Sequence, residues 1–366
     1  MGRKLENLDE IKKQYDFNKT EPEVIIDLVA DANKKGEKIR QRNAEIQEKA
    51  YKILNRLSEN KKIIYSESDV EYLYFENCTS IGIDGSFFPI GGVGGQWYVP
   101  YAIVRILFNH GINQQPIVDV FEAGIEEIKE QEHINVSGEA SKRMLIGETR
   151  ALEDWGFKKI KSLIFIDGPI VDPPAYNDFK YIEYRANVVK SCIENSKLIG
   201  CVKRSRDTFF LKYFEKLLKI DGLKNHFPSD QHLFSYFFTH YRFKNNYEGM
   251  LFSNVLDLSH NETYRIYKEY GISICSIFFQ KSMESTILRL DLPFIDNKTD
   301  MQQLALEGAK AASNWQYPHQ YIPLPVELAH EKCKIREGAA ETIYDEILTK
   351  SRTGSPESIM TMLQLR

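Results

Sequence analysis

The chain has few cysteines, no long apolar run and no excess of basic residues, and each absence excludes a class of protein. Its five cysteines are scattered singly along 366 residues, which argues against a zinc cluster and a disulfide framework. No apolar run approaches the roughly 18 to 20 residues that a membrane-spanning helix needs. The first residues also lack the apolar core of a secretion signal. We therefore expect a cytoplasmic protein with no membrane contact.

The near balance of charge means that any binding to nucleic acid must rely on local basic clusters. The formal net charge is -4, which provides no general attraction to phosphate. The chain also has no Gly-Lys-Ser/Thr phosphate-binding loop, so it encodes no ATP-driven motion. Three basic clusters are candidates, although each alone is more often a solvated surface: Lys158-Lys159-Lys161, Lys203-Arg204-Arg206 and Arg242-Lys244.

Two apolar strands each run into an Asp-Gly step. Asp84 follows Ile81-Gly82-Ile83, and Asp167 follows the apolar run that begins at Leu163. A carboxylate beside a glycine, at the end of an apolar strand, is typical of acidic metal sites. Asp-Gly is also a common turn dipeptide, so either copy alone favours a turn. A third acid is needed to support a metal site.

Glu148 supplies that acid, on a predicted amphipathic helix from Ser141 to Trp155. Apolar side chains gather on one face of this helix at about 100° per residue. Glu148 falls near the middle of that face, where an ionised carboxylate is costly unless a cation or a donor meets it. We interpret Glu148 as a metal ligand in preference to a glutamate that reaches out to solvent.

Composition divides the chain into three parts. Residues 1-75 are charged and helical in pattern, and we expect a helical arm that contacts a partner or a second copy. An arm that folds back on its own core fits the pattern equally well. Residues 76-350 carry the predicted strands and form the main domain, and residues 351-366 are expected to be a C-terminal tail.

The order of the predicted elements indicates the fold class. Three predicted strands joined by short loops, Ser80 to Phe88, Trp97 to Phe108 and Pro116 to Phe121, are followed by the Glu148 helix and a fourth strand, Ser162 to Asp167. This is the opening order of an RNase H-like sheet, whose acids come from the first strand, the first helix and the end of the fourth strand. Asp84, Glu148 and Asp167 occupy those positions. A later helix is predicted from Val326 to Lys350. We expect an α/β protein with an RNase H-like mixed sheet core, flanking helices and an N-terminal helical arm.

The same residues resemble those of the NurA nucleases, over nearly all of the chain after about residue 79. The motifs appear in this order: Ile83-Asp84-Gly85-Ser86, Glu148, Asp167-Gly168-Pro169, Gly200-Cys201-Val202-Lys203, Tyr317-Pro318 and Ala329-His330. The resemblance implies that residues 76-350 form a NurA domain. It also implies a Mn²⁺-dependent nuclease that degrades DNA from 5′ ends, cuts single strands, forms dimers and works with the hexameric HerA ATPase.

The resemblance also implies roles for individual residues. Asp84, Glu148 and Asp167 would bind the metal ions, and His330 would be a further metal ligand or a proton-transfer group. From the residues alone, a lone helix histidine such as His330 is more often structural. Sites of this kind hold two divalent cations about 4 Å apart, and oxygen ligands suit Mn²⁺ or Mg²⁺.

Two further catalytic candidates come from the same comparison of motifs. A tyrosine upstream of the histidine belongs to the family site, and both Tyr317 and Tyr321 are candidates here. Tyr317 is preferred for its proline neighbour, although Gln316 and the longer spacing depart from the usual family pattern. Lys203 ends a predicted strand and would meet a phosphate or the scissile group, with a surface lysine as an equal alternative.

We therefore predict a divalent-metal-dependent DNA nuclease, with 5′-3′ exonuclease and single-strand endonuclease activity. It would act as a homodimer with a HerA-like hexameric ATPase in DNA end processing or phage defence. One alternative is a catalytically silent NurA-like subunit that docks on the ATPase and guides DNA. Another is an RNase H-like enzyme that acts on RNA, because the acids do not distinguish the two substrates.

Overall fold

The computed structural model describes residues 21–59, 64–66, 78–92, 95–112, 114–129, 135–171, 178–219, 221–295, 300–317 and 322–351. The chain divides into two units, residues 1–59 and residues 60–366. In the first unit the described residues form one long helix, α2 (Pro22–Glu59). Near its start α2 exposes a run of apolar side chains: Val24, Ile25, Ile26, Leu28 and Val29.

The helix does not extend over the whole of the predicted arm. It ends at Glu59, and β1 (Ile64–Ser66) pairs antiparallel with β8 (Leu251–Ser253) in the second unit. Three residues that were expected to be helical are therefore part of the sheet. The division at residue 75 and the contact role of the arm stay predictions.

The second unit is built around one mixed sheet. The pairings give the order β5-β4-β2-β6-β7 for its first five long strands, and β2 and β6 are parallel. These strands are β2 (Thr79–Phe87), β4 (Gln96–Ile112), β5 (Ile117–Lys129), β6 (Ser162–Asp167) and β7 (Lys197–Val202). Strands β2, β4 and β5 pair antiparallel with one another in sequence order. Strand β6 follows a helix and pairs with β2 on the side opposite β4. This arrangement confirms the predicted RNase H-like core.

Further strands extend the sheet beyond β7 in the order β11, β10, β8 and β1. The two longest are β10 (Ser273–Gln280) and β11 (Leu288–Phe294), and every residue in both is buried. The remaining short strands are β3 (Ile90–Gly91), which pairs with β4, and β9 (Leu256–Asp257), which pairs with β10.

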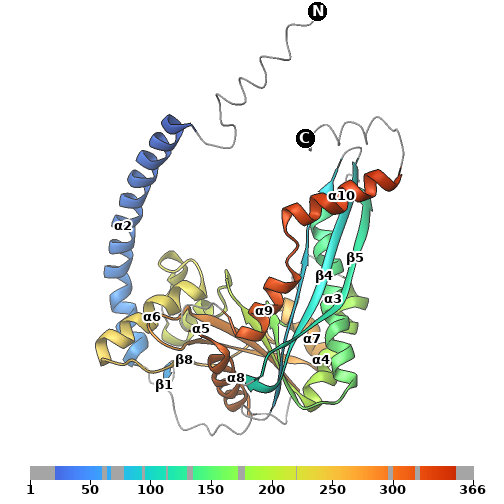
Figure 1. Cartoon of the computed structure of the whole chain (residues 1–366). Helices are drawn as coiled ribbons and strands as arrows, with labels where there is room; N and C mark the ends of the chain where they lie inside the picture. The colour runs from blue at the N-terminus through green and yellow to red at the C-terminus, as the bar shows by residue number, and fades with distance from the viewer. Residues whose placement is uncertain are drawn as a thin grey trace, which may run out of the picture. The chain divides into compact units, whose positions relative to one another are not determined.

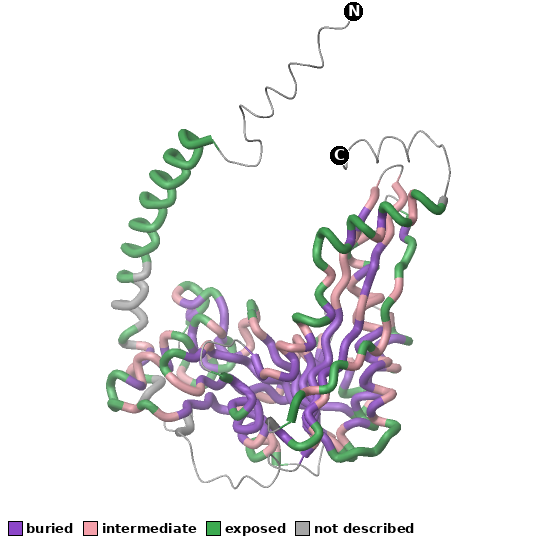
Figure 2. The backbone as a smooth tube through the Cα atoms, in the orientation of Figure 1, coloured by how far each residue is buried: buried purple, intermediate pink, exposed green. Residues whose placement is uncertain are grey.

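The central strands are largely buried (Figure 2). Helices cover both faces of the sheet, and the side chains that alternate along its strands form two apolar layers. One layer packs against α8 (Met301–Trp315) and α9 (Leu324–Cys333). The other packs against α3 (Val136–Phe157), α4 (Phe179–Asn195) and α7 (Glu262–Glu269). Two more helices, α5 (Phe209–Leu218) and α6 (Asp230–Asn245), meet over the Phe278 ring of β10. A short 3₁₀ turn, Leu223–Asn225, lies between them.

The strands β4 and β5 form a long hairpin that extends beyond the rest of the sheet, with α3 alongside (Figure 1). The hairpin register shifts between Ile103 and Val104, which is a β-bulge and increases the local twist. Helix α10 (Glu337–Ser351) packs on the hairpin through Ala340 and Tyr344, beside Tyr98. Among the described residues, no helix has the length and apolarity to cross a membrane.

The predicted helix from Val326 to Lys350 is in fact two helices, α9 and α10. The Ser86 hydroxyl of β2 explains the break, because it donates to the Cys333 carbonyl and accepts from the Ile335 amide at 3.2 Å. A side chain thereby satisfies backbone groups that an interrupted helix leaves unpaired. The break directs α10 toward the hairpin while α9 stays on β2.

Candidate metal centre

Asp84 lies within β2, and only 4% of the residue is exposed. Its Oδ1 accepts a hydrogen bond from the amide of Gly85 at 2.8 Å, which fixes the carboxylate plane. Its Oδ2 faces α9, where His330 Nδ1 lies 2.7 Å away. Burial raises the pKa of the Asp84 carboxyl, and the hydrogen bond from His330 opposes that rise. A buried carboxylate of this kind favours a cationic neighbour.

Helix α9 reaches Asp84 because β2 has a glycine where the two elements cross. A Cβ on Gly82 would lie 2.0 Å from the backbone carbon and oxygen of Pro325. Real Cβ contacts are never this short, so only a glycine permits α9 to lie directly on β2. Two residues further along the same strand face, Asp84 meets His330, one and a half turns into α9.

Asp167 joins this pair from the end of β6. The parallel pairing aligns Ile83 with Ile166, so the two aspartates follow on adjacent strands. Asp167 Oδ2 lies 3.7 Å from His330 Nδ1 and accepts a hydrogen bond from Lys203 Nζ at 2.7 Å. Lys203 comes directly after β7, the next strand in the sheet. The ammonium of Lys203 therefore neutralises one of the two clustered carboxylates.

Asp84, Asp167 and His330 offer three ligand atoms that all lie within 4.8 Å of one another. Carboxylate oxygens and an imidazole nitrogen at that separation can hold a divalent cation. The structure thus brings together three of the four metal ligands that the sequence predicts, from the interior of β2, the end of β6 and a helix far apart in the chain. Their role as ligands stays a prediction.

Glu148, the fourth predicted ligand, lies beside this group but is not one of its members. It is 6% exposed on α3, and its Oε1 would lie 3.0 Å from a Cβ on Gly85. Since Gly85 and Asp84 point to opposite faces of β2, Glu148 approaches the strand from the side opposite His330. Its negative charge contributes to raising the pKa of the Cys333 thiol, after burial and Asp84. Glu148 is thus close to the site, and its role as a ligand stays a prediction.

Two residues near the site were missed by the sequence reasoning. Cys333 Sγ donates to Asp84 Oδ2 at 3.7 Å, and Glu327 lies one turn before His330 on α9. Glu327 Oε2 is buried without a hydrogen-bond partner among the described residues. Burial raises the pKa of Glu327, and the positive charge of Lys203 opposes that rise. The Glu-x-x-His spacing, which places both side chains on one helix face, could have indicated Glu327.

The two candidate tyrosines and the Arg242-Lys244 cluster have separate outcomes. Tyr317 follows α8 and is 40% exposed, and its place in the site stays a prediction. Tyr321 lies outside the described residues. Arg242 is buried and donates to the side chain and carbonyl oxygens of Gln280, so the predicted Arg242-Lys244 cluster is not a two-residue phosphate contact.

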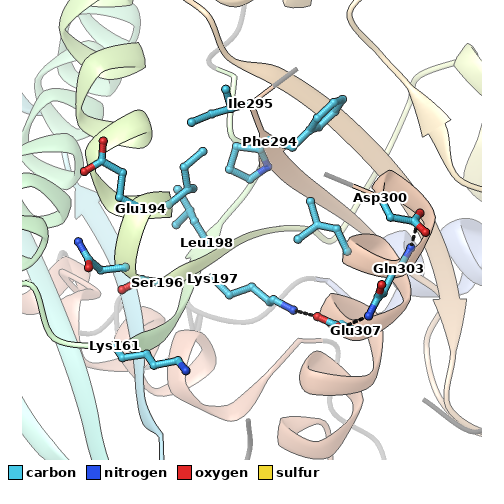
Figure 3. Close-up of a pocket in the computed structure, with 14 residues that line it drawn as sticks. Lys161, Glu194, Ser196, Lys197, Leu198, Phe294, Ile295, Asp300, Gln303 and Glu307 are labelled. Carbon is cyan, nitrogen blue, oxygen red and sulfur yellow. Dashed lines mark hydrogen bonds and ion pairs between the residues drawn. The ribbon is translucent and has the colours of Figure 1, made fainter. Parts of the chain in front are cut away.

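A pocket of about 760 Å³ lies elsewhere, beyond the first residues of β6 and β7 (Figure 3). Lys197 and Glu307 point toward each other across it and form an ion pair, and Gln303 Nε2 donates to Glu307 Oε1 at 3.0 Å. These polar groups already satisfy one another. Asp167 ends β6, so the pocket and the acidic group lie at opposite ends of that strand.

The Asp84–His330 contact predicts how the stability of the metal-free protein depends on pH. The hydrogen bond to Asp84 raises the pKa of His330 above its ordinary 6.5. The charged contact therefore stabilises the fold below about pH 6.5 and is lost as the pH rises through the raised pKa. In EDTA, we expect His330→Asn to lose more thermal stability relative to the parent protein at pH 6 than at pH 8, by differential scanning fluorimetry. His260→Asn, at an exposed turn, is the control, and an equal loss at both pH values would contradict the assignment.

A family model and solved structures both show that this chain is similar to NurA proteins. A family model for the NurA domain matches residues 43–335. The crystal structure of the NurA nuclease from Sulfolobus solfataricus is similar with a TM-score of 0.52 and 16% identity, over 87% of this chain and 99% of that chain. A second crystal structure, of NurA, has a TM-score of 0.50 and 11% identity, over 88% of this chain and 98% of that one. Among curated proteins, no sequence matches.

Proposed function

We propose that this chain, which belongs to the NurA family and is accordingly a nuclease, hydrolyses DNA with divalent metal ions bound by Asp84, Asp167, Glu148 and His330. The resemblance seen in the short motifs is confirmed by the family match, which covers well over half of the chain. The observation that carries the proposal is the group of three ligand atoms within 4.8 Å. We propose Mn²⁺ or Mg²⁺, in two sites, as the ions.

The residues around the group fit such ions. Asp84 and Asp167 provide the oxygen ligands that Mg²⁺ and Mn²⁺ prefer, and His330 adds a nitrogen ligand that Mn²⁺ accepts. The buried, unpartnered Oε2 of Glu327 is a further oxygen for which a cation or its bound water would compensate. Divalent ions in a paired site supply an activated water and stabilise the leaving oxygen of a phosphodiester.

The side chains of the site have separate tasks in this proposal. Asp84 is held in one orientation by the Gly85 amide, which leaves Oδ2 directed at the site. Without metal, His330 holds a proton at Nδ1 more readily than a free imidazole because Asp84 raises its pKa, and it would have to release that proton to bind an ion through this nitrogen. Lys203 Nζ can exchange its hydrogen bond with Asp167 for one with a phosphate oxygen of the substrate. Tyr317 is proposed as the tyrosine of the site.

Cleavage of labelled DNA tests the function directly. Single and double strands labelled at the 5′ or the 3′ end are incubated with Mn²⁺, with Mg²⁺ and with EDTA. We expect cleavage that depends on the ion, begins at 5′ ends and also cuts within single strands. The same assay on RNA strands separates the DNA nuclease from an enzyme that acts on RNA. Cleavage that EDTA does not reduce would contradict the proposal.

Replacement of Glu148 tests the one proposed ligand outside the three-residue group. Glu148→Gln keeps the shape and removes the charge, and we expect cleavage to fall by about a hundredfold. Glu139→Gln, an exposed glutamate on the same helix, is the matched control and should keep full activity. Isothermal titration with Mn²⁺ should also show weaker binding in Glu148→Gln. Full activity in that variant would remove Glu148 from the site.

We further propose that the nuclease works as a dimer with a HerA-like ATPase in DNA end processing or phage defence. The sequence has no ATP-binding loop, so ATP-driven movement along the DNA would have to come from another protein. The exposed apolar run of α2, from Val24 to Val29, is suited to burial against such a partner or a second copy. Light scattering tests the dimer, and co-purification of the ATPase with Ile26→Glu/Val29→Glu tests the helix. A monomer that binds no ATPase would defeat this part alone.

A further inference from the structure

The loop that carries Lys203 also carries two exposed arginines. It joins β7 to α5 and consists of residues 203–208. Arg204 and Arg206 are exposed, while Ser205 between them is buried. Neither arginine has an ion-pair partner among the described residues. The loop therefore directs one cation, Lys203, at Asp167 and leaves two others free next to it.

Buried polar contacts hold this loop in one conformation. Arg289 of β11 is 1% exposed, donates to Ser205 Oγ at 3.1 Å and pairs with Asp207. On the other side, Gln231 Nε2 donates to the carbonyl of Lys203 at 3.2 Å, and the Ser205 amide donates to Gln231 Oε1 at 3.0 Å. A loop fixed in this way loses little conformational entropy when its side chains bind a ligand.

Two further contacts secure the end of the loop. The Asp230 amide donates to the Asp207 carbonyl at 2.8 Å. The Asp230 carboxylate accepts from the amides of Phe210 and Leu211 at 3.1 and 2.9 Å, and so caps the start of α5. Burial raises the pKa of Asp230 to about 7, and its hydrogen bonds are internal to the fold. Asp230 thus explains the position of the loop without a part in chemistry.

We propose that Arg204 and Arg206 bind the phosphates of a nucleic-acid strand next to the scissile phosphate. This rests on the proposed function, because a phosphodiester cleaved at Asp84 and Asp167 must pass the loop that places Lys203 there. Guanidinium groups bind phosphate oxygens through paired hydrogen bonds, and contacts to phosphate carry no sequence information, so this binding is independent of sequence. It also supplies the local attraction that a chain of net charge -4 lacks.

Binding of fluorescein-labelled single-stranded DNA, measured by anisotropy, tests the proposal. All proteins carry Asp84→Asn so that no strand is cut. We expect Arg204→Ala/Arg206→Ala to weaken binding at low salt by about tenfold or more. The slope of log affinity against log salt should become shallower by about 1.4, as expected for two lost contacts to a single strand. Arg204→Lys/Arg206→Lys should keep most of the binding.

The matched control removes two positive charges at the other end of β6. This control is Lys158→Ala/Lys159→Ala. Both lysines lie before β6, whereas the loop of residues 203–208 lies near the end of that strand. Both lysines are exposed, and the surface pair of Lys158 with Asp154 adds little stability. An equal loss of affinity in this control would assign the effect to net charge, or to a strand bound over the Lys158-Lys159-Lys161 cluster and away from the scissile phosphate, and either reading would overturn the proposal.

Two other results also overturn the proposal. One is unchanged affinity and salt slope in Arg204→Ala/Arg206→Ala. The other is intact DNA binding with loss of an acidic protein partner, which would assign the arginines to that partner. Cleavage by the protein with native Asp84 is measured separately. If the loop proposal fails, the protein with native Asp84 still cleaves DNA. If the nuclease function fails, that protein does not cleave DNA, and the anisotropy measurement still reports whether the arginines bind it.

Discussion

Asp84→Asn is expected to lower cleavage by about a thousandfold while leaving the fold intact. The loss of an oxygen ligand and its charge removes several kcal/mol of transition-state stabilisation, and each 1.36 kcal/mol corresponds to a factor of ten in rate. The asparagine side chain can still accept the Gly85 hydrogen bond that Asp84 Oδ1 makes at 2.8 Å. In the absence of metal, Asp84 and Asp167 repel each other, and this repulsion raises the pKa of Asp84 after the effect of burial. Removal of one charge therefore relieves this repulsion, which offsets the loss of the charged contact with His330.

Three measurements check this expectation. Turnover of labelled DNA with Mn²⁺ gives the loss of rate, isothermal titration gives the loss of metal affinity, and the melting temperature in EDTA reports the fold. Glu269→Gln makes the same change of charge at an exposed position of α7 and should leave all three unchanged. Cleavage by Asp84→Asn within tenfold of the parent protein would remove Asp84 from the metal site.

Gly82→Ala is expected to destabilise the protein and to lower cleavage, although Gly82 has no side chain to take part in chemistry. The new Cβ would lie 2.0 Å from the backbone of Pro325, and 2.3 Å from the Val326 amide nitrogen. Backbone atoms cannot yield as a flexible side chain can, so α9 must move off β2. We expect a cost of about 3 kcal/mol or more, which lowers the melting temperature of a chain of this length by roughly 4–5 °C or more. His330 would move with α9, so activity should fall even below the melting temperature.

The control for this substitution is Gly338, a glycine that lies on a helix and not on a strand. Gly338 lies in the first turn of α10, and a Cβ there would meet no atom within 4 Å. Gly338→Ala is therefore expected to be neutral or slightly stabilising. Equal melting temperatures and equal activity of the two variants would contradict the close contact between α9 and β2.

The positions of the strands and of the acids followed from local patterns. The strand predicted over Ser162 to Asp167 has those bounds in the structure, because a short apolar run between polar segments has few other solutions. The predicted helix around Glu148 is α3, which is five residues longer than expected at its start and two residues longer at its end. The spacing of its apolar residues follows from the apolar layer of the sheet, which α3 covers together with α4 and α7.

Other features depended on contacts between distant residues. The strand predicted from Pro116 to Phe121 continues to Lys129, because pairing with β4 extends it through residues that have little strand propensity. The helix predicted from Val326 is broken at Lys334, since Ser86, over 240 positions earlier, satisfies the backbone there. The pattern of residues within one segment cannot indicate a hydrogen-bond partner that is so distant in the sequence.

The sequence by itself determined the fold class, the family and the set of acidic candidates, because these depend on residue type and order. Only the tertiary structure decided how the candidates meet. It placed His330 against Asp84 across Gly82 and paired Lys203 with Asp167. It also put Glu148 on the side of β2 opposite His330 and left the Glu327 Oε2 buried with no hydrogen-bond partner in the described part of the chain. These relations depend on how close two backbones approach and on which face of a strand each side chain takes. Both are set by packing between elements that are remote in the sequence.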